Sequence, residues 1–308
     1  MPPIIETQGL SKRFGGQQAL DRIDLRIEPG TIGLLGPNGA GKSTLIRCLL
    51  QLEAKDSGSA SLLGQDIDAH GREVRKRVGY APEQDCHIPG MAGCEYVTYC
   101  AQLSGLPFAA ARQRAHEMLD FVGMGQERYR LVETYSTGMK QRIKIAQAIV
   151  HDPELVFLDE PTNGLDPEGQ AHILDLIGRI WKESGISVVL SSHLLPDVDR
   201  ICEQIVIVAR GRLVVHDRLQ ELKRRRKPVA ELSVQGGAPE LIEAFSRNGW
   251  PCEMLSNGRI RVSHGQDSLN PMIAFLGERR VAPIEIKASP NALQEFFLQA
   301  LRDQEVTP

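Results

Sequence analysis

Residues 36–44 have the spacing G-x-x-x-x-G-K-[ST], which is typical of loops that bind phosphate groups. Glycines in such a loop let the backbone curl with its N–H groups pointing at an anion. Lys42 can contact terminal phosphates, and Ser43 can offer its hydroxyl to Mg²⁺ at the start of a helix, where anions are favoured. The loop comprises Gly36, Pro37, Asn38, Gly39, Ala40, Gly41, Lys42, Ser43 and Thr44. These residue types predict a phosphate-binding site.

A second group of residues that could take part in a reaction is the acidic pair Asp159 and Glu160, which follows the apolar run 155–158. Four consecutive apolar residues predict a fully buried parallel strand with both carboxylates at its carboxyl end. An aspartate at that place can hold Mg²⁺, directly or through water. A glutamate beside it can orient an attacking water and accept its proton. The pair therefore predicts hydrolytic chemistry close to the phosphate loop.

Two more predicted strands end in polar residues. Glu83 and Gln84 follow the stretch 78–82, and His193 follows the strand predicted at 187–190 and two serines. A solvated loop is the alternative explanation of Glu83 and Gln84, and an isolated histidine is more often structural. However, ligands of open α/β sheets bind at the carboxyl ends of strands, and several such ends carry site chemistry here. We therefore expect Glu83 or Gln84 and His193 in the same site.

Hydrophobic periodicity predicts the elements that position these residues. A buried strand at Thr31–Leu35 and a helix over Ser43–Leu52 flank the phosphate loop. Alternating apolar residues over 4–14 and 23–27 predict antiparallel strands before the loop, and a strand is expected after it at 59–63. Phe14 lies ahead of the loop, either as a core aromatic or as a ring that stacks on a purine base.

A helical region is predicted between residues 87 and 133. One helix has an apolar face of Tyr96, Tyr99, Cys100 and Leu103, and another has a face of Ala115, Met118, Leu119 and Val122. The residues that follow are Ser136, Thr137, Gly138 and Met139, with a helix expected to begin directly after Gly138. This arrangement fits either an ordinary helix cap or an anion site.

The basic run 223–227, followed by Pro228, predicts a linker between two domains. Beyond it the expected order is strand, helix, strand, strand, helix, strand and helix, and the last helix covers residues 291–301. This βαββαβα order predicts a small α+β domain of the ferredoxin-like kind. It contains no recognisable catalytic cluster, so regulation, dimer contact, ligand sensing and a purely stabilising role all stay open.

The composition is that of a globular protein with room for two domains. The chain has 308 residues, 42% hydrophobic and 24% charged, and a net charge of −3 that gives no reason to expect nucleic acid as the main partner. The sequence contains neither an apolar run of bilayer length nor a signal peptide, which predicts a cytoplasmic protein. The 6 cysteines have no metal-ligand spacing and are expected to be reduced thiols.

Taken together, these residues resemble the ATP-binding subunits of ABC transporters over about residues 5–222. Residues 36–44 match the Walker A motif, residues 155–160 match Walker B with its following glutamate, and Gly164-Leu165-Asp166 resembles the D-loop. Residues 136–139 stand where the family usually has Ser-Gly-Gly-Gln, and they keep the serine and the second glycine. His193 resembles the switch histidine, and Phe14 the aromatic residue that stacks on adenine.

The position of the family's Q-loop glutamine falls directly after Pro82, where this chain has Glu83 and then Gln84. We favour Glu83 for the Q-loop role, because exporter-type members of the family are similar to this chain at that position. A carboxylate there would add negative charge near the metal and the phosphates.

The resemblance implies an α/β fold in which a P-loop, RecA-like parallel sheet is joined by an antiparallel β subdomain and a helical subdomain that carries the signature. The expected organisation is an ATPase domain at 1–222 with its helical subdomain at about 88–135, a basic linker at 223–228, and a C-terminal α+β domain at 229–308.

The resemblance also implies how the site works with ATP and Mg²⁺. Lys42 and the loop amides hold the β- and γ-phosphates, while Ser43 and Asp159 hold Mg²⁺. Glu160 polarises the attacking water and His193 senses the γ-phosphate. Because the chain has one phosphate loop and one signature, two copies are needed, and the signature residues Ser136, Thr137, Gly138 and Met139 serve the partner's ATP. Asp166 is the D-loop residue.

The function expected from this resemblance is ATP hydrolysis that powers a separately encoded membrane permease, most simply an exporter, with the chain peripheral on the cytoplasmic face. An importer ATPase is the first alternative. A soluble ABC-type ATPase that acts on nucleic acid or ribosomes is a second, and a regulatory ATP-binding module without turnover is a third. The presence of both Glu160 and His193 disfavours the last.

Overall fold

A computed structural model describes residues 2–225, 229–234, 238–255, 257–263, 269–279 and 281–288. The chain divides into two units, Met1–Leu219 and Gln220–Pro308. All the residues that the sequence places in the site belong to the first unit.

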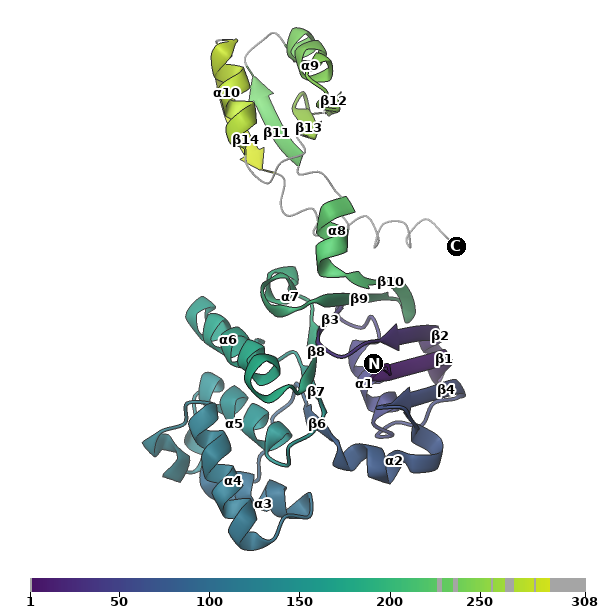
Figure 1. The fold of residues 1–308 in the computed structure, drawn as a ribbon, viewed down its shortest axis with the longest axis vertical. Helices are drawn as coiled ribbons and strands as arrows, with labels where there is room; N and C mark the ends of the chain where they lie inside the picture. Colours follow the sequence, from purple (N-terminus) through teal and green to yellow (C-terminus); the bar gives the residue numbers. More distant parts are fainter. Residues whose placement is uncertain are drawn as a thin grey trace. The chain divides into compact units, whose positions relative to one another are not determined.

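The central element of the first unit is a six-stranded sheet in the order β10-β9-β3-β8-β7-β6 (Figure 1). Its strands are β3 (Thr31–Leu35), β6 (Val78–Ala81), β7 (Leu155–Asp159), β8 (Ser187–Ser192), β9 (Gln204–Ala209) and β10 (Arg212–Arg218). All of them are parallel except β10, which is antiparallel to β9 at one edge. Strands β3, β7, β8 and β9 are buried along their whole length, which explains the apolar runs 155–158, 188–190 and 205–209 within three of them.

The register of these strands brings the predicted site residues to one edge of the sheet. Leu35 at the end of β3 is level with Ser192 of β8, and Asp159 of β7 is level with Ser191. The phosphate loop, Glu160 and His193 therefore leave the sheet side by side, as parallel strands require.

A second sheet has the order β2-β1-β4-β5 and is formed by β1 (Ile5–Phe14), β2 (Gln17–Ile27), β4 (Ser57–Leu62) and β5 (Gln65–Asp66). Its pairings are antiparallel, as the alternating sequence predicts. One hydrophobic core contains Leu25 of this sheet, Leu45 of α1 (Lys42–Leu49) and Phe157 of β7. Helix α1 and the phosphate loop are thus anchored by a core that includes both sheets. The predicted α/β fold is confirmed.

The remaining helices of the first unit include those predicted between residues 87 and 133 and the one predicted after residues 136–138. They are α2 (Ile67–Lys76), α3 (Gly93–Leu103), α4 (Phe108–Phe121), the short 3₁₀ helices η1 (Gln126–Tyr129) and η2 (Val132–Thr134), α5 (Thr137–Ile149), α6 (Pro167–Ser184) and α7 (Leu195–Ile201). Helices α3, α4 and α5 gather on one side of the sheet in Figure 1. Among the described residues, the longest helices are too short or too polar to span a bilayer.

Two details of this helical region differ from the prediction. The buried face of α3 consists of Gly93, Tyr96, Val97, Thr98 and Ala101, whereas Leu103 is 71% exposed and Tyr99 is 40% exposed. The small residues Gly93 and Ala101 let the helix approach its neighbours, so the larger apolar side chains need not face inward. Helix α5 begins at Thr137 and not after Gly138, because Ser136 caps it by accepting a hydrogen bond from the Met139 N–H at 3.3 Å.

The second unit contains a four-stranded antiparallel sheet in the order β12-β13-β11-β14. Its elements are β11 (Val229–Val234), α9 (Ala238–Arg247), β12 (Cys252–Met254), β13 (Ile260–Ser263), α10 (Asn270–Glu278) and β14 (Pro283–Ala288). Both helices pack on one face, where Phe245 and Met272 meet Leu232. The βαββαβ order with this strand arrangement is the ferredoxin-like fold that the sequence predicts. The further helix predicted at 291–301 lies outside the described residues.

The boundary between the units contains a helix where the sequence predicts a linker. Helix α8 (Leu219–Arg225) includes residues 223–225 of the basic run. Leucine, lysine and arginine all have high helix propensity, so a run of them favours a helix over residues 219–225. Residues 226–228 lie outside the described part of the chain.

Candidate functional site

The phosphate loop joins the buried strand β3 to α1, and its shape depends on Gly41. This residue has φ +107°, and a Cβ there would lie 2.6 Å from the Ala19 carbonyl oxygen. Gly41 is also the N-cap of α1 and provides no side-chain cap. The N–H groups of the first turn of α1 are therefore available to an anion.

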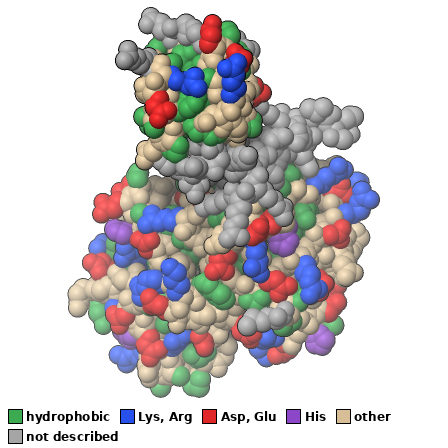
Figure 2. Space-filling model, turned by 45° about the horizontal axis from the view of Figure 1, so that its top comes forward, with side chains coloured by type: hydrophobic (Ala, Val, Ile, Leu, Met, Phe, Trp, Pro, Cys, Tyr) green, Lys and Arg blue, Asp and Glu red, His purple; other side chains and the backbone are tan. Residues whose placement is uncertain are grey.

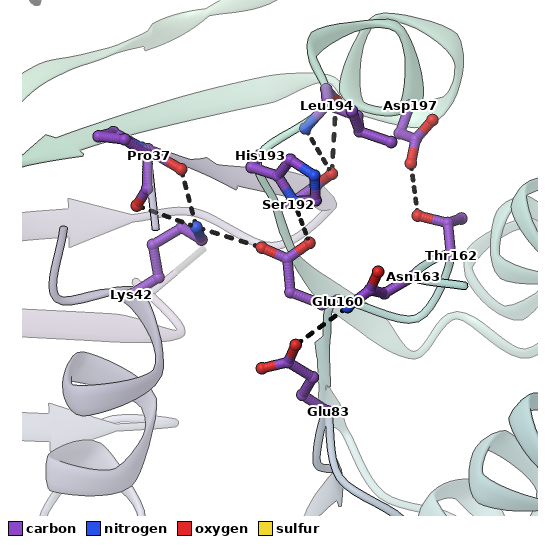
Figure 3. Close-up of polar contacts among 11 residues, drawn as sticks. Pro37, Lys42, Glu83, Glu160, Thr162, Asn163, Ser192, His193, Leu194 and Asp197 are labelled. Atoms are coloured by element: carbon purple, nitrogen blue, oxygen red, sulfur yellow. Dashed lines mark hydrogen bonds and ion pairs between the residues drawn. The ribbon is translucent and has the colours of Figure 1, made fainter. Parts of the chain in front are cut away.

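Lys42 lies at the mouth of this loop with only 6% of its surface exposed. Its Nζ donates to the carbonyl oxygens of Gly36 at 2.7 Å and Pro37 at 3.4 Å, and it forms an ion pair with Glu160 Oε1 at 3.1 Å (Figure 3). The Lys42 ammonium thus folds back onto the backbone of its own loop and faces Glu160.

Glu160 is held by bonds from both its backbone and its side chain. It has φ +48°, a conformation that costs a non-glycine residue about 1 kcal/mol or more, and its N–H donates to the Ser191 carbonyl oxygen at 3.1 Å. Its Oε2 accepts from His193 Nδ1 at 2.8 Å (Figure 3). The carboxylate therefore bridges Lys42 and His193, and this strained conformation holds it facing the loop.

Asp159, the last residue of β7, is 2% exposed, and its Oδ1 has no hydrogen-bond partner within the described residues. A buried carboxylate oxygen without a donor is costly, so it fits a ligand for a metal ion. The described residues contain no cluster of three or more histidine, cysteine, aspartate or glutamate side chains that could hold a metal alone. Mg²⁺ commonly takes one or two protein oxygens and completes its shell with phosphates and water. The donor set therefore fits Mg²⁺ bound together with a phosphate chain.

Glu83 and Gln84 behave differently in the structure. Glu83 follows β6 and accepts a hydrogen bond at its Oε1 from Asn163 Nδ2 at 3.0 Å (Figure 3). Gln84 is exposed and is not among the described residues that line the cleft. Of the two alternatives left open by the sequence, the structure brings Glu83 to the site.

The loop and the strand ends enclose a cleft of about 560 Å³. Its lining residues are Phe14, Gln17, Ala19, Asn38, Gly39, Ala40, Gly41, Lys42, Ser43, Thr44, Glu83, Glu160, Asn163 and His193. Phe14 is 45% exposed, so it is not a core aromatic, and Lys12 Nζ lies 4.9 Å from the centre of its ring. An aromatic ring at the rim of a phosphate cleft can stack on a base.

The predicted signature and D-loop residues form a separate cluster outside that cleft. A Cβ at Gly138 would lie 3.9 Å from Leu165, and one at Gly164 would lie 3.7 Å from Thr137. Asp166 caps α6 by accepting a hydrogen bond from the Gly169 N–H at 3.1 Å. Within one copy of the chain, Ser136, Thr137, Gly138, Met139 and Asp166 do not line the cleft that holds Lys42.

The structure adds polar residues that the sequence did not single out. Thr162 Oγ1 donates to Asp197 Oδ2 at 2.6 Å, and burial raises the pKa of the Asp197 carboxyl. Lys144 is 2% exposed, and burial lowers the pKa of its ammonium group. Asn163 contacts Glu83, which lies 80 positions earlier in the chain. Only the contacts of the fold reveal these four residues, Thr162, Asp197, Lys144 and Asn163, because each looks like an ordinary turn or helix residue in the sequence.

Comparison with known proteins gives matches over the same region. The family model described as ABC transporter matches residues 20–163. The daunorubicin/doxorubicin resistance ATP-binding protein DrrA of Streptomyces peucetius is 40% identical over 220 residues, which cover 71% of this chain and 66% of that protein. The bacitracin transport ATP-binding protein BcrA of Bacillus licheniformis is 34% identical over 308 residues, which cover 98% of each chain.

A solved structure supports the fold. The structure of cbiO1 from Clostridium perfringens, described as part of the ABC transporter complex cbiONQ, has a TM-score of 0.66 and 24% identity, and the match covers 80% of this chain and 96% of that one. Since BcrA matches over almost its entire length, this chain belongs to the family of ABC transporter ATP-binding proteins, which are ATPases.

Proposed function

We propose that this chain binds and hydrolyses ATP to power a separately encoded membrane permease, and that the transport is export. The observation that carries the proposal is the chain of contacts from Lys42 through Glu160 to His193 at the mouth of the phosphate loop. The names of two relatives support the direction, since one is a drug-resistance ATP-binding protein and the other a bacitracin transport ATP-binding protein.

In this proposal the adenine stacks on Phe14, while the loop amides and Lys42 hold the β- and γ-phosphates. Phosphate oxygens compete with Glu160 for the Lys42 ammonium, which frees the carboxylate to face the attacking water. Glu160 then accepts a proton from that water, and His193 Nδ1 fixes the orientation of the carboxylate. Ser43 and Asp159 would hold Mg²⁺, which supplies charge neutralisation for the phosphates when it is bound.

A second copy of the chain is part of the proposal. The signature residues Ser136, Thr137, Gly138 and Met139 lie apart from the cleft of their own chain, beside the D-loop that contains Asp166. We assign them to the ATP of the partner copy, which makes the active form a homodimer. Ser136 Oγ occupies the Met139 N–H, and the other first-turn amides of α5 carry partial positive charge that suits a phosphate.

The proposed partner is an integral membrane permease on whose cytoplasmic face the chain sits. Figure 2 shows acidic and basic side chains interspersed over the described residues of the face in view, which does not resemble the basic stripe of a nucleic-acid-binding protein. For the domain organisation we propose an ATPase domain at 1–222, a connecting segment at 223–228 and an accessory domain at 229–308.

The test is purification of the tagged full-length chain from detergent-solubilised membranes of cells that also express the neighbouring gene products. Recovery of a stoichiometric integral membrane protein, together with stimulation of ATP hydrolysis when both are placed in lipid vesicles, supports the proposal. Recovery with ribosomes or DNA, without a membrane protein, contradicts it.

A further inference from the structure

A row of polar side chains along one face of α5 contacts β6 and the segment that follows it. Lys140, Lys144 and Gln147 lie on α5, and His151 lies just beyond its C-terminal end. Their spacing of four, three and four residues places them on one side of the helix. We call these four residues the α5 stripe.

The partners of the α5 stripe follow the chain from β6 into the segment of Glu83. His151 Nε2 bonds the Val78 carbonyl oxygen at 3.2 Å, and Gln147 Nε2 donates to the Tyr80 carbonyl oxygen at 2.8 Å. Lys144 Nζ donates to the carbonyl oxygens of Pro82 at 2.8 Å and Glu83 at 2.7 Å. Lys140 Nζ pairs with Asp85 Oδ2 at 2.8 Å. The helix is thus matched residue by residue to residues 78–85.

The position of β6 explains why such a row is needed. This strand is the edge of its sheet and pairs only with β7 among the described strands, so its outer carbonyl groups have no neighbouring strand to bond. Buried backbone carbonyls require donors, and α5 runs beside β6 (Figure 1) and provides them. An apolar helix face would satisfy packing but would leave these groups unpaired.

Lys144 is the centre of the α5 stripe. Its side chain is 2% exposed, and burial lowers the pKa of its ammonium group, while the charges of Cys86, Asp85, Glu83 and Asp159 act in the opposite direction. An ammonium group that donates to two backbone carbonyls makes strong charge-assisted bonds. These bonds fix the backbone of Glu83, whose carboxylate lines the nucleotide cleft and accepts from Asn163.

The same helix begins at the signature. Ser136 caps α5, and at 1.5 Å per residue Lys144 lies about 12 Å further along the axis. A short rigid helix therefore connects the backbone of Glu83 to the residues assigned to the partner's ATP.

We propose that the α5 stripe, with Lys144 as the positioning residue, couples Glu83 at the cleft of one chain to the signature residues 136–139 that it offers to the partner. The coupling rests on the proposed two-copy function. A nucleotide that shifts Glu83 also shifts the backbone carbonyls to which Lys144 donates. Helix α5 then moves with them, because the α5 stripe is hydrogen-bonded to residues 78–85 over several helical turns. Lys144 touches no reacting atom and acts through the two elements that it joins.

The test compares Lys144→Met with Arg114→Met. Arg114 donates to the Val150 carbonyl oxygen at 3.3 Å and pairs with Asp152 at 3.2 Å, so it holds the far end of α5 without contacting residues 78–85. Each substitution is made alone and in a Glu160→Gln chain, in which slow hydrolysis preserves an ATP-bound dimer. The measurements are Mg·ATP affinity, hydrolysis rate, ATP-dependent dimer formation, and hydrogen exchange of residues 82–86 and 136–142.

Lys144→Met is expected to keep the ATP affinity of the single chain and to weaken ATP-dependent dimer formation and hydrolysis by about tenfold, the scale of an ordinary coupling energy. Hydrogen exchange at residues 82–86 should become faster in Lys144→Met. Arg114→Met should leave dimer formation, hydrolysis and this exchange unchanged. If Lys144→Met does not fold, Gln147→Leu replaces it and should shift dimer formation in the same direction by less.

Dimer formation, hydrolysis and exchange equal to those of the parent in a folded variant would overturn the coupling and leave the proposed function in place. A Glu160→Gln chain that forms no ATP-dependent dimer would contradict the proposed function itself, and the coupling with it.

Discussion

Lys42 Nζ and Glu160 Oε1 form an ion pair of 3.1 Å in which both side chains are almost fully buried. The pair brings together the ends of two strands, since Lys42 follows β3 and Glu160 follows β7. It also brings together the group that attracts phosphate and the group that activates water. The Lys42 ammonium and the Glu160 carboxylate thus neutralise each other until phosphate oxygens compete for the lysine.

Replacing Lys42 by methionine should destabilise the fold as well as abolish ATP binding. Loss of one partner leaves the Glu160 carboxylate buried with His193 as its remaining side-chain partner, which costs about 3 kcal/mol in comparable buried pairs. The double variant Lys42→Met, Glu160→Leu should recover most of that stability without recovering ATP binding. Urea denaturation of both variants measures this. A single variant as stable as the parent would show that the pair is solvated and unimportant to the fold.

Gly41→Ala should damage the phosphate loop far more than Gly39→Ala. At Gly41 a Cβ would meet the Ala19 carbonyl oxygen at 2.6 Å, while at Gly39, where φ is +77°, it would meet nothing within 4 Å. Gly39→Ala should therefore destabilise the loop only by the cost of a left-handed conformation for alanine, about 1 to 2 kcal/mol. Titration with ATP should show a larger loss of affinity for Gly41→Ala. Equal losses for the two variants would argue against the close approach of Gly41 to Ala19.

Glu83→Gln should keep ATP hydrolysis within about tenfold of the parent, a change of less than 1.4 kcal/mol in the barrier. The glutamine oxygen can still accept from Asn163 Nδ2, and Lys144 binds the backbone of this residue and not its side chain. Steady-state hydrolysis at saturating Mg·ATP measures the effect. Complete loss of turnover with intact folding would mean that the negative charge of Glu83 is itself required.

Asp197→Asn should raise the stability of the protein at neutral pH. Because burial raises the pKa of Asp197 in the folded state, the folded chain binds more protons than the unfolded chain above the normal carboxyl pKa. Stability therefore falls as the pH rises through this window, and the charged form is the costly one. Asparagine keeps an acceptor for Thr162 Oγ1 without the charge.

Thermal unfolding at several pH values checks this prediction. The Asn variant should have a Tm about 1 to 3 °C higher at pH 7, and the advantage should shrink as the pH falls toward 4. A lower Tm at pH 7 would show that the Asp197 charge is stabilised by a partner stronger than Thr162.

The sequence predicted the parts of the site that local chemistry determines. The glycine spacing of residues 36–44, the continuous apolar strands and the polar residues at their ends are read directly, because buried parallel strands and phosphate loops admit few alternatives. Parallel pairing then brings Glu160 and His193 to the same edge as Lys42. The ferredoxin-like order of the second unit was predicted from its alternation of strand-like and helix-like hydrophobic patterns.

The sequence could not reveal contacts made across the fold. Lys144 stands between two isoleucines on a helix and looks like a surface residue, yet it is buried because the edge strand β6 needs donors. Tyr99 and Leu103 were assigned to a buried face, but small residues allow α3 to pack on its other side. In both places tertiary packing, and not the local pattern, decides which side chain is buried.

The most direct test of the site is ATP hydrolysis by the purified chain with and without Glu160→Gln, with Glu154→Gln as the control for loss of a paired surface carboxylate. Glu154 pairs with Arg77 away from the cleft. We expect Mg²⁺-dependent hydrolysis in the parent and in the control. Glu160→Gln should retain ATP binding and lose at least about 100-fold in rate, the lower limit for removing a positioned base. Hydrolysis by Glu160→Gln at the parental rate would contradict the account.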